Sequence, residues 1–297
     1  MRAFRQPGKL STLILLAAAG GISPLQAALY TLTANEQLYV SLSNDLIVNN
    51  TTVIHGDVGL GGTGTSLQIQ NTASITPFSP YTGSVSFSGA TTCSGNGCPP
   101  ATNVAGGLKA NISSVTNAVN DYNNLVSTLT AMTGGTNIAI TGNQTLSTPG
   151  LYNATSFNMA GNITLSGNST DQYVIRVPGT VNITSGSIVL SGGLKPDNVI
   201  FLFDPGTAGQ NLNWNSSGSF SGILLGNANV ATMSFSNTTN GSGIGRVILT
   251  NTSGSIQFSG GGFFGAGGVP EPSTFSLVGL GVAVVVLKLR KARGSPP

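Results

Sequence analysis

The run Ile163-Thr164-Leu165-Ser166-Gly167-Asn168 carries the pattern on which the fold depends: apolar, polar, apolar, then small turn-forming residues. Alternation with period two places one set of side chains in a core and the other in solvent. Strands this short cannot each bury a face alone, but stacked on one another they can. The same phrase recurs along Thr136–Phe264, in Ile138-Ala139-Ile140, Val181-Asn182-Ile183, Ile188-Val189-Leu190, Met233-Ser234-Phe235, Val247-Ile248-Leu249 and Ile256-Gln257-Phe258. The pattern therefore predicts a mostly β chain folded as a β-solenoid, with a sandwich or barrel as the competing shape.

Charged residues are scarce in the strand-forming body of the chain and concentrated at its two ends. Charged residues make up 6% of the 297 residues, against about 25% in an average soluble domain. Seven of the 11 basic residues lie in the terminal segments, which leaves four basic and seven acidic residues between them. A body with a net charge of about −3 and no basic patch has no electrostatic footprint for nucleic acid.

The first 27 residues have the layout of a secretory signal peptide. Arg2, Arg5 and Lys9 precede the apolar run Leu10–Ala19, and small residues end at Ala27. This order predicts export, with cleavage before Ala28. The alternative is a buried N-terminal helix.

The periodicity changes from two to three and four within Asn103–Met132, which predicts a helix over residues 103–132. A single apolar seam should lie along the flat side of the strand stack; a coiled-coil seam or a membrane-surface helix are alternatives. The seam consists of Val104, Leu108, Ile112, Val115, Val119, Tyr122, Val126 and Leu129.

Few residues offer catalytic or metal-binding chemistry. His55 and Asp57 would share one face of a strand, but the chain has no second histidine, so we predict no catalytic, cofactor or metal site. A polysaccharide-active enzyme is the remote alternative, because a glycosidase or lyase needs a pair of carboxylates in a cleft. The carboxylates that could supply such a pair are Asp57, Asp171, Asp197 and Asp204.

Cys93 and Cys98 are the only cysteines of the sequence. In an exported chain such a pair predicts one small disulfide loop. The single tryptophan, Trp214, has no aromatic neighbour in sequence that would make a binding platform, so we expect it in the core.

The C-terminal end has three parts that read as a sorting and anchoring signal. A Gly- and Pro-containing linker, residues 265–274, is followed by an apolar run and a basic cluster within residues 275–297. The stretch Phe275–Leu289 would be about 22 Å long as a helix, shorter than the roughly 30 Å hydrocarbon core of a bilayer. We therefore expect a marginal transmembrane helix that holds the chain in the inner membrane only transiently, before processing.

This end resembles the PEP-CTERM sorting signal through Val269, Pro270, Glu271 and Pro272, the apolar run and the basic end. The resemblance implies an envelope or secreted protein that is handled by an exosortase-type machinery, and proteins of this class often accompany exopolysaccharide.

The body, residues 28–264, resembles the bacterial and fungal ice-binding-like domain family. If the resemblance holds, the fold is a right-handed, discontinuous β-solenoid of triangular section with one long flanking helix. The N-terminal piece would close one end of the stack. Four stretches carry the likeness: Thr52–Gly59, Val119–Asn123, Leu146–Asn158 and Asn162–Val177.

Together these features predict a non-enzymatic, exported surface protein whose solenoid face contacts an extended surface, either ice or an exopolysaccharide matrix. Asn162, Thr164, Asn182 and Thr184 are the candidate contact residues, because they fall at outward positions of successive rungs. Hydroxyl groups on rigid rungs could order water, or bind sugars. The alternatives are a purely structural matrix or adhesion protein without a specific ligand, and ordinary solvent-side residues chosen for strand propensity.

Overall fold

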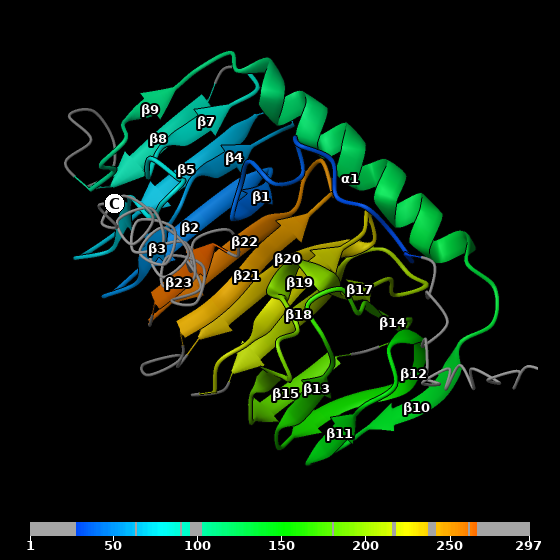
Figure 1. Cartoon of the computed structure of the whole chain (residues 1–297). Coiled ribbons are helices and arrows are strands. Elements are labelled where there is room, and N and C mark those ends of the chain that lie inside the picture. The colour runs from blue at the N-terminus through cyan, green and yellow to red at the C-terminus, as the bar shows by residue number, and fades with distance from the viewer. Residues whose placement is uncertain are drawn as a thin grey trace, which may run out of the picture.

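The alternating stretches form short strands that pair in parallel from one coil of the chain to the next. The structure is a computed structural model that describes residues 28–62, 64–89, 91–95, 103–179, 181–215, 218–236, 242–260 and 262–265. The prediction of a mostly β chain with one long helix is confirmed (Figure 1). The expected signal helix and C-terminal helix lie outside the described residues.

One wall of the stack is covered by the helix. Its neighbouring strands pair in parallel throughout. In spatial order they are β9 (Leu108–Lys109), β7 (Val85–Phe87), β4 (Val58–Leu60), β1 (Ser41–Ser43), β21 (Ser242–Leu249), β19 (Ser221–Gly226), β17 (Val199–Phe203), β14 (Tyr173–Val177), β12 (Gly150–Ala160) and β10 (Thr136–Ile140).

A second wall runs beside the first and ends in the second half of β12, which bends from one wall into the other. Its strands also pair in parallel. They are β8 (Thr91–Gly95), β5 (Thr65–Ile69), β2 (Asp45–Asn49), β22 (Ser255–Ser259), β20 (Val230–Ser236), β18 (Gln210–Asn215) and β15 (Val181–Ser185).

The third wall is interrupted. One part pairs with the first half of β21 and the other is a separate three-stranded sheet. The strands are β6 (Ser74–Thr76), β3 (Val53–His55) and β23 (Gly262–Gly265), and then β16 (Ile188–Ser191), β13 (Ile163–Ser166) and β11 (Gln144–Leu146). A short 3-10 helix, η1 (Pro196–Asn198), lies between β16 and β17.

The chain does not build the stack from one end to the other in sequence order. It starts near the middle, where β1, β2 and β3 pair with the last strands β21, β22 and β23. It then builds outward to β9, returns along the side of the stack as helix α1 (Ser113–Ala131), and builds back from β10 (Figure 1).

Helix α1 is shorter than the sequence pattern predicted, so the expected start at Asn103 is wrong. Gly107 and Asn111 adopt positive φ angles of 74° and 55°, and Leu108–Lys109 pairs with β7 as strand β9. Val104 belongs to the strand stack, since it bridges Ile75 and is 3% exposed. Two left-handed residues and a strand pairing therefore override the helical periodicity before Ser113.

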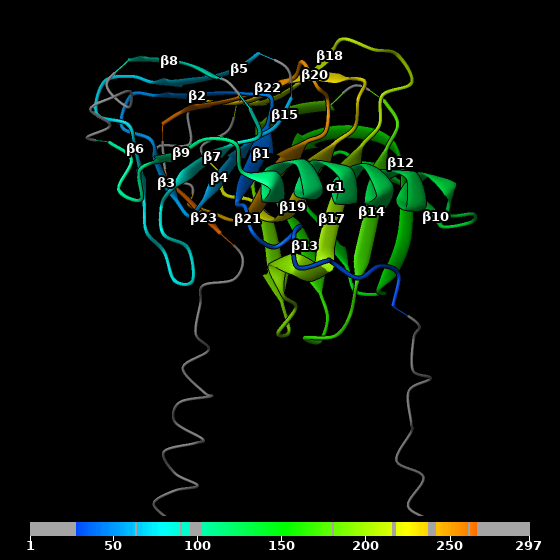
Figure 2. The same cartoon turned by 90° about the horizontal axis from the view of Figure 1, so that it is seen from above.

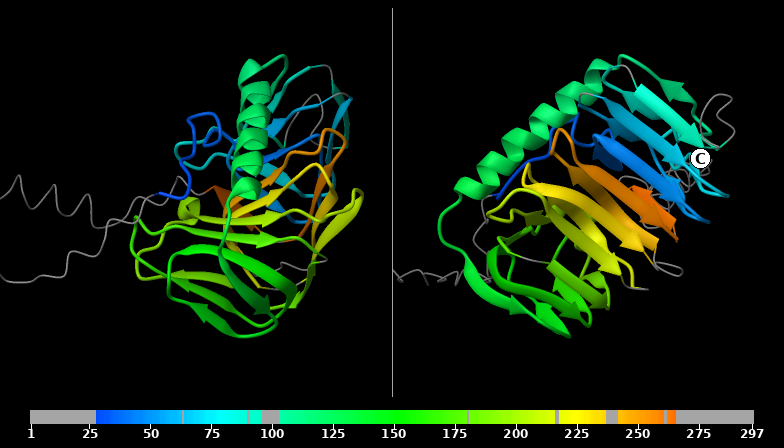
Figure 3. Two further views of the ribbon diagram at one scale, coloured as in Figure 1. Left: turned by 90° about the vertical axis from the view of Figure 1, so that its right-hand side faces the viewer. Right: turned by 180° about the vertical axis from the view of Figure 1, so that it is seen from behind.

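The end of α1 is fixed by one cation from the wall beneath it. The Arg176 guanidinium donates hydrogen bonds to the carbonyl oxygens of Thr130 (3.1 Å) and Met132 (2.7 Å) and to Asn153 Oδ1 (2.6 Å). The last carbonyls of a helix lack partners inside the helix and carry partial negative charge, so a cation there is favourable. The helix lies along the first wall (Figure 3). Its buried residues pack against the outer side chains of that wall. Across the described stretches, no helix combines the length and apolarity that a membrane crossing needs.

Candidate functional site

The second wall is a broad, open surface of small polar side chains. Seen from behind in Figure 3, β5, β2, β22, β20 and β18 lie side by side, and no other described helix or strand covers them. Along each of these strands the buried positions alternate with half-buried or exposed ones. We call the outward side chains of these five strands the polar wall: Asn211, Asn213, Asn215, Thr232, Ser234, Ser236, Ser255, Gln257, Ser259, Asp45, Ile47, Asn49, Ser66 and Gln68.

Strand register arranges the polar wall in three columns across the strands. The central column is Asn213, Ser234, Gln257, Ile47 and Gln68, each paired with the next. The flanking columns run Asn211–Thr232–Ser255–Asp45–Ser66 and Asn215–Ser236–Ser259–Asn49. Neighbouring strands lie about 4.8 Å apart, and alternate residues on one strand about 6.6 Å apart. The polar groups therefore form a two-dimensional lattice with these two repeats.

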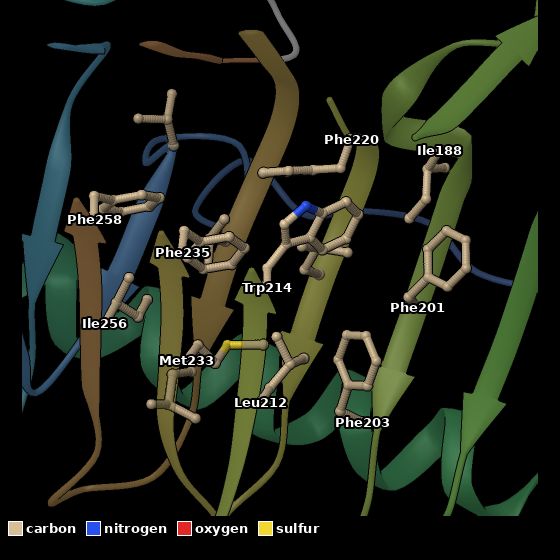
Figure 4. Close-up of a cluster of buried hydrophobic side chains, with 14 of the residues drawn as sticks. Ile188, Phe201, Phe203, Leu212, Trp214, Phe220, Met233, Phe235, Ile256 and Phe258 are labelled. Atoms are coloured by element: carbon tan, nitrogen blue, oxygen red, sulfur yellow. The ribbon is translucent and has the colours of Figure 1, made fainter. Parts of the chain in front are cut away.

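A continuous stack of large side chains stiffens the polar wall from inside. Trp214, Phe235 and Phe258 stand at equivalent positions of β18, β20 and β22, with ring centroids 6.3 and 5.1 Å apart (Figure 4). Phe220 closes against the first two of these rings, at 5.5 and 5.6 Å. All four are at most 4% exposed. Close-packed interiors resist displacement, so the outward groups are held at fixed positions.

The polar wall is almost free of charge. Asp45 is the one charged residue among those that define it, and its Oδ1 accepts hydrogen bonds from Ser66 N (2.8 Å) and Asn44 Nδ2 (3.0 Å). Contacts between outward side chains are long: Thr232–Ser255 and Ser236–Asn215 are both 3.4 Å. The wall therefore presents hydroxyl and amide groups toward solvent, suited to many weak hydrogen bonds and not to a charged ligand.

Comparison with known proteins agrees with this architecture. The family described as ice-binding-like matches residues 42–253, and the PEP-CTERM protein-sorting motif matches residues 268–291. The chain belongs to the ice-binding-like family. The sorting motif marks it as an exported protein.

Individual relatives of this ice-binding-like protein are distant. An ice-binding protein of Flammulina populicola is 33% identical over 102 residues, which are 34% of this chain and 37% of that protein. The fold resembles that of an ice-binding protein from an Antarctic biological consortium, with a TM-score of 0.55, 21% identity, and coverage of 81% of this chain and 95% of the other. An ice-binding protein with antifreeze activity from an Arctic yeast gives a TM-score of 0.51 at 16% identity, over 83% and 98%. These relatives are named as ice-binding proteins. As a member of the ice-binding-like family, this chain is non-enzymatic.

The candidate contact residues expected from the sequence do not lie on one face of this ice-binding-like protein. Thr164 lies on β13 of the third wall, where it pairs with Thr145 and Val189. Thr184 is exposed on β15, which continues the polar wall beyond β18. Asn182 occupies the same strand, but its side chain lies outside the described part of the structure. Consecutive rungs in the sequence therefore belong to different walls.

Asn162 is a corner residue. Its Oδ1 accepts a hydrogen bond from Ser187 N (2.9 Å), and its own N–H donates to Asn143 Oδ1 (2.8 Å). Ser187 Oγ in turn accepts from Ser219 N (3.1 Å). This ladder of side chains satisfies the backbone donors where the chain turns from the second wall to the third.

Other singled-out residues also have structural partners. Asp57 Oδ1 accepts hydrogen bonds from the N–H and hydroxyl groups of both Thr82 and Ser84, at 2.8–3.1 Å. His55 Nδ1 lies 2.8 Å from the Thr76 hydroxyl, and burial lowers the pKa of this imidazole. Asp171 accepts from Asn168 N, and Asp204 from Asn227 Nδ2. Nowhere in the described residues do three His, Cys, Asp or Glu side chains converge.

The remaining predicted features fall at the edge of the described structure. Cys93 is disulfide-bonded, and Cys98, the other cysteine of the sequence, lies outside the described residues. Val269, Pro270, Glu271 and Pro272 lie outside them as well. They fall within the matched sorting motif.

Sequence reasoning missed the residues that form the centre of the polar wall, namely Asn213, Ser234 and Gln257. The outward alternation of Asn211, Asn213 and Asn215 was a usable signal. What was lacking was the register, because β2 and β5 join this wall from residues 45–69, far from β22 in sequence.

Proposed function

We propose that the polar wall binds ice. The supporting observation is the lattice of mainly hydroxyl and amide groups across five aligned strands, in which Asp45 is the one charged and Ile47 the one apolar member. The Trp214–Phe235–Phe258 stack backs this lattice from inside. Ice is an extended repeating surface, so a rigid repeating array can engage it at many points at once. Each contact is weak, and a fixed array avoids the entropic cost of ordering its side chains on binding.

An exopolysaccharide matrix is the second candidate ligand. Asn213, Asn215, Gln257 and Gln68 carry amide groups, which both donate and accept hydrogen bonds and so match sugar hydroxyls. The resemblance of the C-terminal end to PEP-CTERM signals supports this candidate, because proteins of that class often accompany exopolysaccharide. A purely structural matrix protein would need neither contact.

We further propose the following organisation for the whole chain. Residues 1–27 are a signal peptide, and residues 28–264 form a right-handed β-solenoid domain. Residues 265–274 link this domain to a hydrophobic anchor and basic tail, residues 275–297. An exosortase-type machinery would recognise the sorting motif after transient insertion in the inner membrane, and the processed protein would remain in the envelope or outside the cell.

Ice recrystallisation inhibition by the purified chain tests the proposal. Ser234→Tyr puts a bulky ring at the centre of the lattice, where its neighbours are Asn213 and Gln257. We expect this variant to lose most of the inhibition. Thr164→Tyr is the matched control, because Thr164 is also a half-buried outward residue but lies on the third wall, and it should retain activity.

Circular dichroism melting of both variants shows that the fold is intact. Absence of inhibition by the unmodified chain at micromolar concentration would refute ice binding. Retention of secreted polysaccharide by the unmodified chain, lost in Ser234→Tyr, would then favour the matrix ligand.

A further inference from the structure

The last described strand leaves the body on the side away from the polar wall. β23 ends at Gly265 and pairs with β3 and β21. Figure 2 shows β23 and the first described residues on the side opposite β5, β22, β20 and β18, and the left view of Figure 3 agrees. The sorting motif begins at residue 268, shortly after β23. The chain therefore leads toward this motif from the side of the body opposite the polar wall.

The connection to the apolar run is short. Residues 266–274 separate β23 from Phe275, and nine residues span about 30 Å at full extension. To turn the polar wall toward a membrane that holds Phe275–Leu287, this segment would have to pass around the body. The packed sheets of the body lie about 10 Å apart, before any outer side chain is counted. Because β23 ends on the side opposite the polar wall, the connection reaches the membrane most directly when the polar wall faces outward.

Apolar surface outside the polar wall supports the same orientation. The large hydrophobic side chains that the described residues expose are Leu38 and Val189, at 41% and 37%. Val189 lies on β16 of the third wall, beside a groove of about 300 Å³ that Leu190, Leu194 and Pro196 also line. Lys195, exposed between the last two, carries a long aliphatic stem and a cation. This combination suits the boundary between acyl chains and anionic headgroups.

We infer that, when its C-terminal segment holds the chain at a membrane, the third wall with Val189 and the groove faces the lipid surface and the polar wall faces away. This inference rests on the proposed anchor, but it does not depend on whether the outward ligand is ice or polysaccharide. It assigns the third wall a lipid partner and leaves the second wall free for an external surface.

Energy transfer on vesicles tests the orientation with the full chain. Single-cysteine variants Val189→Cys and Ser234→Cys are labelled with a maleimide donor, which the disulfide-bonded Cys93 does not take up. The labelled chains are bound to phosphatidylcholine–phosphatidylglycerol vesicles that carry an acceptor lipid. Because the two probes lie on different walls, about one sheet spacing or 10 Å apart, we expect transfer from position 189 to exceed that from position 234 clearly.

Equal transfer from both positions, or stronger transfer from position 234, would overturn the inference. Failure of the full chain to float with the vesicles would overturn it too. Val285→Arg, which places a charge in the apolar run, should abolish flotation and transfer at both positions. Ice inhibition is a separate readout, so loss of the ice proposal and loss of the orientation remain distinguishable.

Discussion

Trp214 shows how a single residue supports the polar wall. It is fully buried between the rings of Phe220 and Phe235, directly behind Asn213 and Asn215. The sequence predicted a core position for it, because no aromatic neighbour would make it a binding platform, and the structure confirms this. Trp214 therefore supports the polar wall indirectly, through the rigidity of the strands in front of it.

Trp214→Ala should lower the free energy of unfolding by about 3–5 kcal/mol, the usual cost of truncating a large buried aromatic residue. Urea unfolding followed by circular dichroism measures the change. Trp214→Phe keeps an aromatic ring in the stack and should cost clearly less. Equal stability of the alanine variant and the unmodified chain would show that the stack does not bear on the fold.

Asn162 marks the limit of residue-by-residue prediction. Its outward position was inferred correctly from alternation, but a corner asparagine and a wall asparagine have the same sequence pattern. The role of the asparagine depends on whether the chain continues as a strand or turns at that point. Here the chain turns, and Asn162 Oδ1 accepts a hydrogen bond from Ser187 N in the next coil. Hydrogen bonds across 25 residues are not visible in local periodicity.

At the scale of elements, the stack depends on close contact between successive coils. Gly245 of β21 has a φ of 153° and pairs with Gly222 of β19. A Cβ atom at Gly245 would lie 1.8 Å from the Gly222 carbonyl oxygen. The two strands can reach their register only if this position has no side chain.

Gly245→Ala should therefore destabilise the protein by at least about 2 kcal/mol, because the strand must shift away from backbone and not from a flexible side chain. Thermal unfolding provides the measurement. Gly142→Ala is the matched control, since a Cβ atom there meets nothing within 4 Å. Similar melting temperatures for the two variants would contradict the close-packing argument.

Strand and helix type were predictable from the sequence, whereas boundaries and wall membership were not. Period-two alternation identified strands such as β13, β20 and β22, since their inner residues are buried hydrophobic ones. The helix was recognised from Val115 to Leu129 but was extended too far toward its N-terminus, where Gly107 and Asn111 break it. The candidate contact residues are spread over different walls for a related reason, because register among distant segments decides which outward residues share a face.

At the scale of the whole molecule, a buried polar cluster ties the N-terminal segment to the helix and the stack. Arg246 on β21 is 1% exposed and forms an ion pair with Asp197, at 3.3 Å between Nη1 and Oδ1. The Tyr122 hydroxyl donates to the Glu36 carbonyl oxygen at 2.7 Å, and Glu36 Oε2 accepts from Thr33 N at 2.5 Å. Segments separated by up to 210 residues are thus joined in one network.

The carboxyl groups of this cluster should make stability depend on pH. Burial raises the pKa of Glu36 above its ordinary 4.5, and hydrogen bonds from Thr33 offset this shift only in part. Burial likewise raises the pKa of Asp197 above 3.8, and the Arg246 cation offsets that shift only in part. The folded chain therefore keeps protons that the unfolded chain releases. As the pH rises from about 4 toward neutrality, the free energy of unfolding should fall, because the unfolded state gains stability by ionising first.

Glu36→Gln removes one of these titrations while leaving an amide oxygen that can accept the Thr33 N–H. Its free energy of unfolding should therefore decline less between pH 4 and pH 7 than that of the unmodified chain, and the two proteins should differ most at pH 7. Urea titrations at a series of pH values measure both slopes. An unchanged slope in the variant would mean that Glu36 ionises as readily in the folded chain as in the unfolded one. The cluster would then join the N-terminal segment to the stack without any loss of folding free energy from a buried Glu36 carboxylate.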